Sequence, residues 1–143
     1  MPQARHALYA GGEDLHVSVW PGSARLTNQI TRFIAREGRV WSLAAGGLLS
    51  LEDVPGDFPL RDVLEQQEGT VYQTGGSAVA APDGTWLLPP DESTEGLVVA
   101  DLDLAAVRRE RHNFDAVGHY GRPDVFHVSV DRRRRRSTDF VDD

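Results

Sequence analysis

The hydrophobic period changes twice within residues 15–45, and this change most constrains the fold. Residues 15–20 have the sequence LHVSVW, in which Leu15, Val17 and Val19 alternate with His16, Ser18 and Trp20. Alternation of this kind predicts a strand, closed by Pro21-Gly22. Residues at helical spacing follow at about 26–37, and a short apolar run at 40–45 predicts a buried strand. A strand, a helix and a strand in this order favour an α/β architecture.

Local signals set the expected ends of these elements. A helix is predicted at 2–10, where Gly11-Gly12 ends it, and the helix at 26–37 has Thr27 or Asn28 as possible caps and Gly38 as its stop. Residues 48–74 are rich in proline, glycine and charge, so we expect a long excursion with at most a short helix near 60–66.

The second half of the chain continues with strand signals. Two apolar runs flank Pro82-Asp83-Gly84, which predicts a hairpin. Further strands are expected at LVVADLDL and at 126–130, with a short helix at 105–111 between them. The total is about six strands around three helices, as a βαβ unit followed by meandering β-structure. One sheet with helices on one face leaves its other face in need of a partner.

Two residue types are absent from the 143 residues: cysteine and lysine, so all 15 basic residues are arginine. Disulfides, thiolate metal sites and cysteine nucleophiles are therefore excluded for this chain. The net charge of −7 argues against a nucleic-acid-binding protein. Arg132–Arg136 form a basic run, which we expect to belong to a solvated, disordered tail at 131–143. The sequence contains no long apolar run and no signal-peptide pattern, so we expect a cytoplasmic protein away from membranes.

Most candidate polar side chains favour structural roles. The carboxylates Glu13 with Asp14 and Asp101 with Asp103 favour solvation or helix capping over acid–base work. His16 favours a satisfied position in the sheet, and His112, His119 and His127 lack compact ligand spacing, so no metal site is expected. Ser77 after Gly75-Gly76 matches neither a nucleophile elbow nor a phosphate loop. The cluster His119, Tyr120, Arg122 and Asp124 favours an ion pair or a subunit contact over substrate binding.

Several ordered motifs carry a resemblance to one family. They are MPQARHALYAGGEDLHVSVWPG, TRFIAREGRVW, AAGGLL, GGSAVAAPDGTW, EGLVVADLDLAAVRRER and NFDAVGHYGRPDVF. In this order they resemble the nitrilase branch of the carbon-nitrogen hydrolases over nearly all of residues 1–128. The resemblance implies an α/β fold, namely the C-terminal part of a four-layer α-β-β-α sandwich, with a nitrilase-like domain at 1–130.

The resemblance also implies a chemistry. The family hydrolyses a nitrile to a carboxylic acid and ammonia with a cysteine thiolate, a glutamate base and a lysine that stabilises negative charge on nitrogen. These groups precede the region matched here, so this chain is expected to contribute no catalytic residue, no cofactor and no activity alone. Whether it is an enzyme by itself is therefore uncertain. Trp20 and Pro21 are expected to line the substrate pocket, although a tryptophan that only fills the core is an equal alternative.

Three hypotheses follow for the chain as a whole. It is a truncated nitrilase, a half-enzyme that joins a separate N-terminal chain, or a non-catalytic interaction module. We expect a homo-oligomer or a complex with the missing N-terminal half. Because Met1-Pro2 coincides with an internal Met-Pro of the family, we also expect the upstream reading frame to encode Cys-Trp-Glu within about ten residues.

Overall fold

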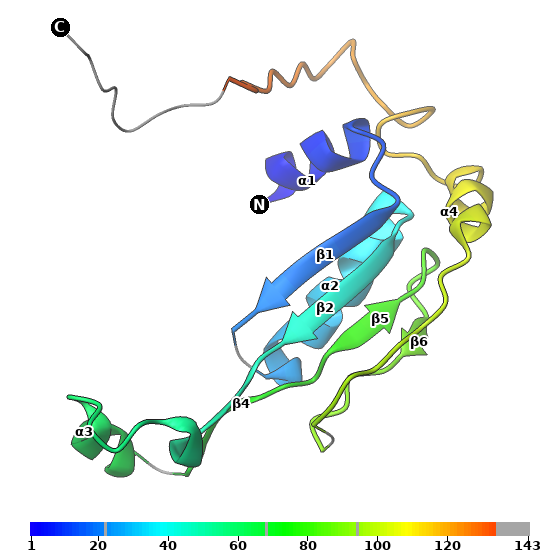
Figure 1. The fold of residues 1–143 in the computed structure, drawn as a ribbon. Coiled ribbons are helices and arrows are strands. Elements are labelled where there is room, and N and C mark those ends of the chain that lie inside the picture. Colours follow the sequence, from blue (N-terminus) through cyan, green and yellow to red (C-terminus); the bar gives the residue numbers. More distant parts are fainter. Residues whose placement is uncertain (22, 68, 94, 134–143) are drawn as a thin grey trace, which may run out of the picture.

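The computed structural model describes residues 1–21, 23–67, 69–93 and 95–133. Figure 1 shows a twisted sheet with helices against it and a separate arm that projects from one end. The elements in chain order are α1 (Pro2–Ala10), β1 (Leu15–Trp20), α2 (Ala24–Gly38), β2 (Trp41–Gly46), β3 (Leu48–Ser50), a 3₁₀ turn (Leu51–Asp53), α3 (Arg61–Glu65), β4 (Val71–Thr74), β5 (Ala78–Ala80), β6 (Trp86–Leu88) and α4 (Leu104–Arg111). The α/β class expected from the sequence is confirmed.

The main sheet has four strands in the order β1-β2-β5-β6. β1 pairs with β2 in parallel, from Leu15 opposite Trp41 to Trp20 opposite Gly46, and α2 forms the crossover between them. The strands β2, β5 and β6 then pair antiparallel, as the predicted hairpin requires. The expected βαβ unit followed by a meander is therefore confirmed.

One face of this sheet is built from small side chains, and α2 packs on it. Ser42, Ala44 and Ala80 are all nearly inaccessible to solvent. Small residues let the helix approach the strands closely, and the buried side of α2 supplies Thr27, Thr31, Ile34 and Ala35. α1 lies beside the end of α2, where Tyr9, Ile34 and Val40 form a buried cluster. α2 makes one helical layer on one face of the sheet, which is consistent with a part of the expected sandwich.

The opposite face of the sheet is apolar and only partly covered. At one end α4 covers it, and Val107 packs there against Trp41 and Val79. The β1 residues of the same face remain accessible: Leu15 is 39% exposed, Val17 55% and Val19 79%. The alternation predicted for β1 is present, but its apolar side remains accessible to solvent among the described residues. This bare face is the one that the sequence predicted to need a partner.

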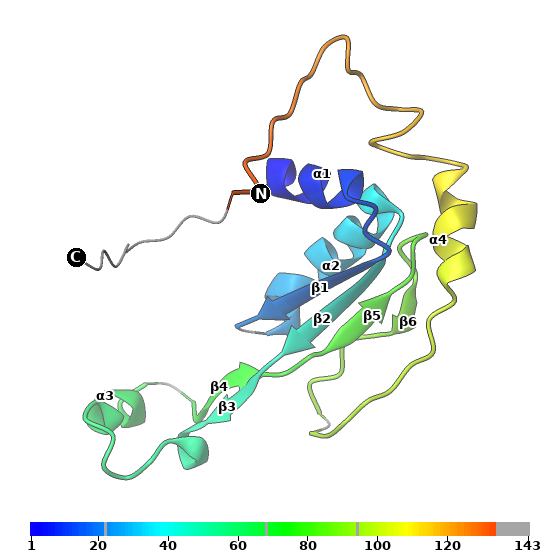
Figure 2. The same ribbon diagram turned by 45° about the horizontal axis from the view of Figure 1, so that its top comes forward.

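The excursion at 48–74 contains more regular structure than its composition predicts. β3 and β4 pair antiparallel as a separate two-stranded sheet, and α3 lies near the expected short helix at 60–66. Together they form the arm that leaves the body in Figure 2. The strands are three and four residues long. Segments this short show no clear alternating pattern, so the surrounding proline and glycine led to the prediction of an irregular segment.

Two predicted strands, LVVADLDL and 126–130, are absent from the part of the chain that the structure describes. Both segments are extended without strand pairing, and Val99 and Phe126 are exposed. The pattern describes side chains, whereas a strand also requires a neighbouring backbone, and neither segment has one here. In the second half of LVVADLDL, Leu102 packs against the buried cluster that includes Val107 of α4.

Gly38 has a different role from the predicted helix stop. α2 includes Gly38, and the left-handed cap residue is Arg39, with φ of 50° and ψ of 49°. A Cβ on Gly38 would lie 2.3 Å from Cε1 of Tyr9, so the glycine allows the ring of Tyr9 to pack on the helix. At the other end the cap position is Ser23 rather than Thr27 or Asn28.

The remaining expectations concern the helices and the tail. The short helix at 105–111 is confirmed as α4. Among the described residues, no helix has both the length and the apolar character that a membrane span requires. Of the tail expected at 131–143, residues 134–143 lie outside the described residues, and Arg134–Arg136 are among them.

Candidate functional site

The carboxyl ends of β1 and β2 lie side by side and form the candidate site. Their parallel register places Trp20 opposite Gly46 at the last pair of the ladder. In open α/β sheets, ligands bind outside the carboxyl ends of parallel strands. Pro21 follows directly and is exposed. The structure therefore places the two predicted substrate-binding residues at an edge where α/β proteins build binding sites.

Trp20 lies on the face of the sheet that α2 covers. It alternates with Val19, so it shares the side of His16 and Ser18 and is partly buried. Its indole Nε1 is buried without a hydrogen-bond partner among the described residues. A buried indole N–H normally has an acceptor, so this donor is left without a hydrogen bond among the described residues.

Glu92 joins two elements, the start of α2 and the end of β4. Its carboxylate accepts hydrogen bonds from the backbone N–H of Ala24, at 3.3 Å, and from the hydroxyl of Thr74. Ala24 is the first residue of α2, and Thr74 is the last residue of β4. Glu92 therefore links the start of the helix to the end of the arm that adjoins the main sheet. A carboxylate also complements the positive end of a helix. Nothing in the sequence predicted this role, because the three partners are far apart in the chain.

Paired glycines let two chain segments cross at the same edge. A Cβ on Gly46 would lie 2.0 Å from the carbonyl oxygen of Gly75, and a Cβ on Gly76 would lie 2.7 Å from the Cβ of Ala24. Gly75 and Gly76 have φ of 78° and 75°, values that favour glycine. Ser77 accepts a hydrogen bond from the Gly46 N–H at 3.0 Å. The prediction that these glycines permit close backbone approach is confirmed.

The acidic pair at the other end of β1 is structural. The carboxylate of Glu13 lies 2.9 Å from Nδ1 of His16, and Asp14 pairs with Arg111 at 3.1 Å. These contacts attach α4 to the loop before β1. They agree with the prediction that His16 is satisfied within the sheet.

Two other carboxylates also have structural partners. Asp103 accepts from the Ala105 N–H at 2.9 Å and so caps α4. Its pKa is lowered chiefly by the hydrogen bond from Arg109, with the cap as a second cause. Asp124 forms a bidentate pair with Arg122, at 2.7 and 2.8 Å, which lowers the pKa of the carboxyl. Both predictions of structural roles are confirmed, and both pairs lie at the surface.

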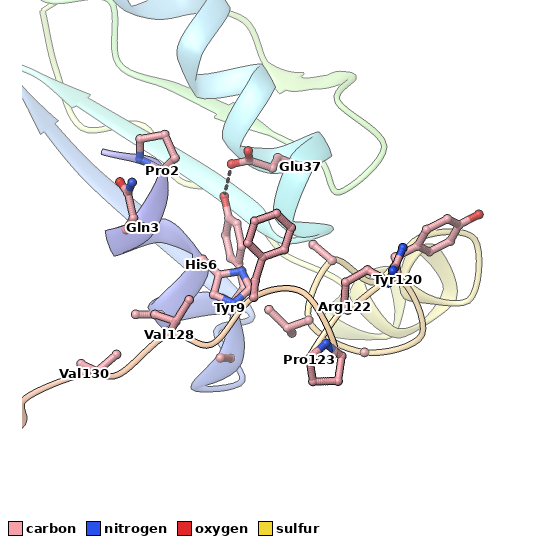
Figure 3. A pocket seen from close by; sticks show the side chains of 17 residues that line it. Pro2, Gln3, His6, Tyr9, Glu37, Tyr120, Arg122, Pro123, Val128 and Val130 are labelled. Carbon is pink, nitrogen blue, oxygen red and sulfur yellow. Dashed lines mark hydrogen bonds between the residues drawn. The ribbon is translucent and has the colours of Figure 1, made fainter.

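A groove of about 660 Å³ lies elsewhere, between α1 and the C-terminal segment. Figure 3 shows Tyr9 at its floor, hydrogen-bonded to Glu37, with Val128 and Val130 on the extended chain beside it. The Tyr9 hydroxyl donates to Glu37 at 3.0 Å. Burial raises the pKa of Tyr9, and the nearby carboxylate adds to this. Neither Trp20 nor Pro21 lines this groove, so it is distinct from the strand edge.

The described side chains do not form a catalytic centre by themselves. Within residues 1–133, less the three single-residue gaps, no three or more metal-binding side chains come together. Ser77 lies at the edge, but its hydroxyl accepts from a backbone amide and has no histidine partner. The edge offers the ring of the partly buried Trp20, whereas the sequence contains no cysteine and no lysine.

Comparison with known proteins identifies the family. The model of the carbon-nitrogen hydrolase family matches residues 1–112. This chain belongs to the carbon-nitrogen hydrolase family. It is 35% identical to Nitrilase 1 of Arabidopsis thaliana over 99% of its length, and 35% identical to the aliphatic nitrilase of Sinorhizobium fredii over 92%. A bifunctional nitrilase/nitrile hydratase of Lupinus angustifolius is 34% identical over 91% of the chain and is covered over 38% of its own length.

The match covers only part of these relatives. The chain spans 42% of the length of the first two. Within the carbon-nitrogen hydrolase family, the chain therefore corresponds to one part of the length of these relatives. This agrees with a sheet whose apolar face stays uncovered in the described residues.

Proposed function

We propose that this chain is the C-terminal part of a nitrilase-type carbon-nitrogen hydrolase that converts a nitrile to a carboxylic acid and ammonia. The observation that carries the proposal is the sheet at 15–88, which offers a binding edge and an uncovered apolar face. In this proposal the nitrilase-like domain extends over 1–130, and 131–143 are a tail. The similarity to nitrilases supports the choice of substrate class.

The catalytic groups come from outside these 143 residues in this proposal. The family's thiolate and ammonium are residue types that this sequence lacks. Attack by a thiolate on the nitrile carbon needs a positioned base and a donor for the developing negative charge on nitrogen. Trp20 and Pro21 then supply one wall of the pocket, with the Trp20 ring against the organic group of the nitrile.

The surface of β1 supports a complementary protein segment as partner. β1 pairs with β2 on one side and is the first strand of the described sheet, so its other edge is open to a further strand. Leu15, Val17 and Val19 present the apolar face that a second sheet would cover. We propose that a complementary protein segment, or a second copy of the chain, covers this apolar face of β1. We also propose that the assembly is cytoplasmic. The net charge of −7 disfavours binding to nucleic acid and to anionic membrane surfaces.

Reconstitution tests the proposal. The purified chain is mixed with the segment of the S. fredii aliphatic nitrilase that it does not cover, and ammonia release is measured on aliphatic and aromatic nitriles. We expect no release from the chain alone and release from the mixture. The activity should disappear when the cysteine of the added segment is replaced by alanine. Ammonia release from the chain alone, scaling with protein through purification, contradicts the proposal.

The role of Trp20 needs a separate control. Trp20→Leu should raise KM for the nitrile in the active mixture, because the pocket loses its aromatic wall. Trp86→Leu is the matched control, since Trp86 is another partly buried tryptophan of the same sheet but lies on β6. An equal effect of both substitutions would mean that Trp20 acts only through the stability of the sheet.

A further inference from the structure

The helix α2 begins without the local contacts that commonly hold the start of a helix. In the part of the chain that the structure describes, its N-cap residue Ser23 makes no side-chain cap hydrogen bond, and the first turn contains no acidic residue. The first backbone N–H groups of a helix have no partner within the helix, and a negative charge beside them is stabilising. Glu92 supplies this contact from a distant part of the chain, since its carboxylate accepts a hydrogen bond from the Ala24 N–H at 3.3 Å.

Two further contacts restrain the same place. The oxygen of Glu92 that accepts from Ala24 also accepts from the hydroxyl of Thr74, which orients the carboxylate. The backbone of Gly76 lies against Ala24, because a Cβ on Gly76 would come within 2.7 Å of the Cβ of Ala24. The start of α2 is therefore held by segments that do not belong to the helix.

Trp20 lies directly before this helix start. β1 ends at Trp20 and α2 begins at Ala24, and Figure 1 shows both at the same end of the sheet. The four Cα–Cα steps between these two residues span at most about 14 Å, so a shift of the helix start is passed to Trp20 and Pro21. Trp20 also forms the last pair of the ladder with β2, so no later pair of the strand restrains it.

We propose that Glu92 is a positioning residue for nitrile binding, because it caps α2 from outside the helix and thereby fixes Trp20 at the binding edge. The inference rests on the proposed function and adds to it a residue that no local motif identifies. Glu92 acts through the Ala24 amide and not on the nitrile itself. Its replacement should therefore change how firmly Trp20 is held, and through this the affinity for the nitrile.

Fluorine NMR of the chain labelled with 5-fluorotryptophan tests the positioning without any activity. The sequence contains three tryptophans, and Trp20→Phe assigns the resonance of Trp20. In Glu92→Ala, this resonance should move toward its position in the urea-unfolded chain, because the helix start opens locally. The resonance of Trp41, which is only 6% exposed, should stay unchanged and so exclude a general loss of stability.

Three variants separate the hydrogen bond from the charge. Glu92→Gln keeps an acceptor oxygen and should leave Trp20 close to its original resonance. Thr74→Val keeps the shape of the side chain but removes the hydroxyl, and should shift Trp20 in the same direction by a smaller amount. Glu95→Ala is the matched control, since Glu95 is an exposed carboxylate nearby without a hydrogen bond among the described residues. This control should have no effect.

Kinetics of the reconstituted mixture test the consequence for the nitrile. Glu92→Ala should raise KM at least about threefold and leave kcat nearly unchanged, because only the placement of the binding wall is lost. Glu92→Gln should restore most of the affinity. A merely structural role would instead lower the amount of active mixture and leave KM as it is.

The possible failures are distinguishable. An unmoved Trp20 resonance in Glu92→Ala, or equal movement of Trp20 and Trp41, overturns the proposal. A moved Trp20 resonance with an unchanged KM also overturns it and leaves the nitrilase assignment intact. A mixture that releases no ammonia even without substitutions refutes the proposed function instead, and the Trp20 resonance alone then supports or overturns the role of Glu92 at the edge.

Discussion

Gly38→Ala should destabilise the chain, although alanine is the better helix former. A Cβ at this position would lie 2.3 to 2.7 Å from three ring carbons of Tyr9. Tyr9 is only 6% exposed and packs with Ile34 and Val40, so the ring has little room to move. Its displacement also breaks the hydrogen bond to Glu37, which is 3.0 Å long.

The magnitude follows from three opposing terms. Overpacking of a core costs about 1–3 kcal/mol. The lost hydrogen bond adds about 1 kcal/mol. Higher helix propensity returns at most about 1 kcal/mol, and less at the last residue of a helix. We therefore expect the free energy of unfolding to fall by about 1–3 kcal/mol.

The assay is urea denaturation followed by far-UV circular dichroism, in two backgrounds. In the Tyr9→Leu background, two of the three crowding ring carbons are gone, so Gly38→Ala should be neutral or stabilising. This change of sign identifies the ring contact as the cause. If Gly38→Ala costs the same free energy in both backgrounds, or stabilises the unmodified chain, the packing argument is wrong.

Three further predictions concern the sheet, the hairpin and the helix start. Val17→Asp should reduce the activity recovered with the complementary segment at least about tenfold, because the substitution buries an unpaired charge in the assembly. Val71→Asp is the control: it changes a valine of similar exposure (57%) on the arm and should leave the recovered activity unchanged. Hydrogen bonds from the side chain and the backbone N–H of Thr85 lower the pKa of Asp83. The ionised carboxyl therefore stabilises the fold above its unfolded pKa of about 4, and this stabilisation is lost as the pH falls through the lower pKa of the folded state. Asp83→Asn should remove that part of the acid dependence of the melting temperature, and an unchanged acid dependence would count against it. Glu92→Ala should speed hydrogen exchange at the Ala24 amide, whereas Glu92→Gln keeps an acceptor and should change it less. Equal exchange rates in the two variants would contradict the hydrogen bond between Glu92 and the start of α2.

Short-range signals account for the elements that were predicted correctly. The helix at 2–10, the strand at 15–20 and the hairpin around Pro82-Asp83-Gly84 depend on periodicity and turn residues that act within a few positions. The cap of α4 by Asp103 belongs to the same class, since the carboxylate reaches an amide two residues away.

Long-range partners account for what was missed or wrong. β3 and β4 exist because two short segments about 20 residues apart meet, which neither segment indicates by itself. The segments at 97–103 and 126–130 carry strand patterns, but pairing depends on a neighbour that the described chain does not place there. Glu92 joins Ala24 and Thr74 only because the fold brings together three segments that are distant in the sequence.

The sequence by itself determined the α/β class, the βαβ unit and the resemblance to nitrilases, because these depend on residue order and local chemistry. It also determined that no cysteine and no lysine is present. Only the tertiary structure decided which way the sides of β1 face: Trp20 lies toward α2, while Val17 and Val19 lie on an uncovered surface. Alternation separates the two sides of a strand, but only the packing of a helix against one of them decides which side is buried.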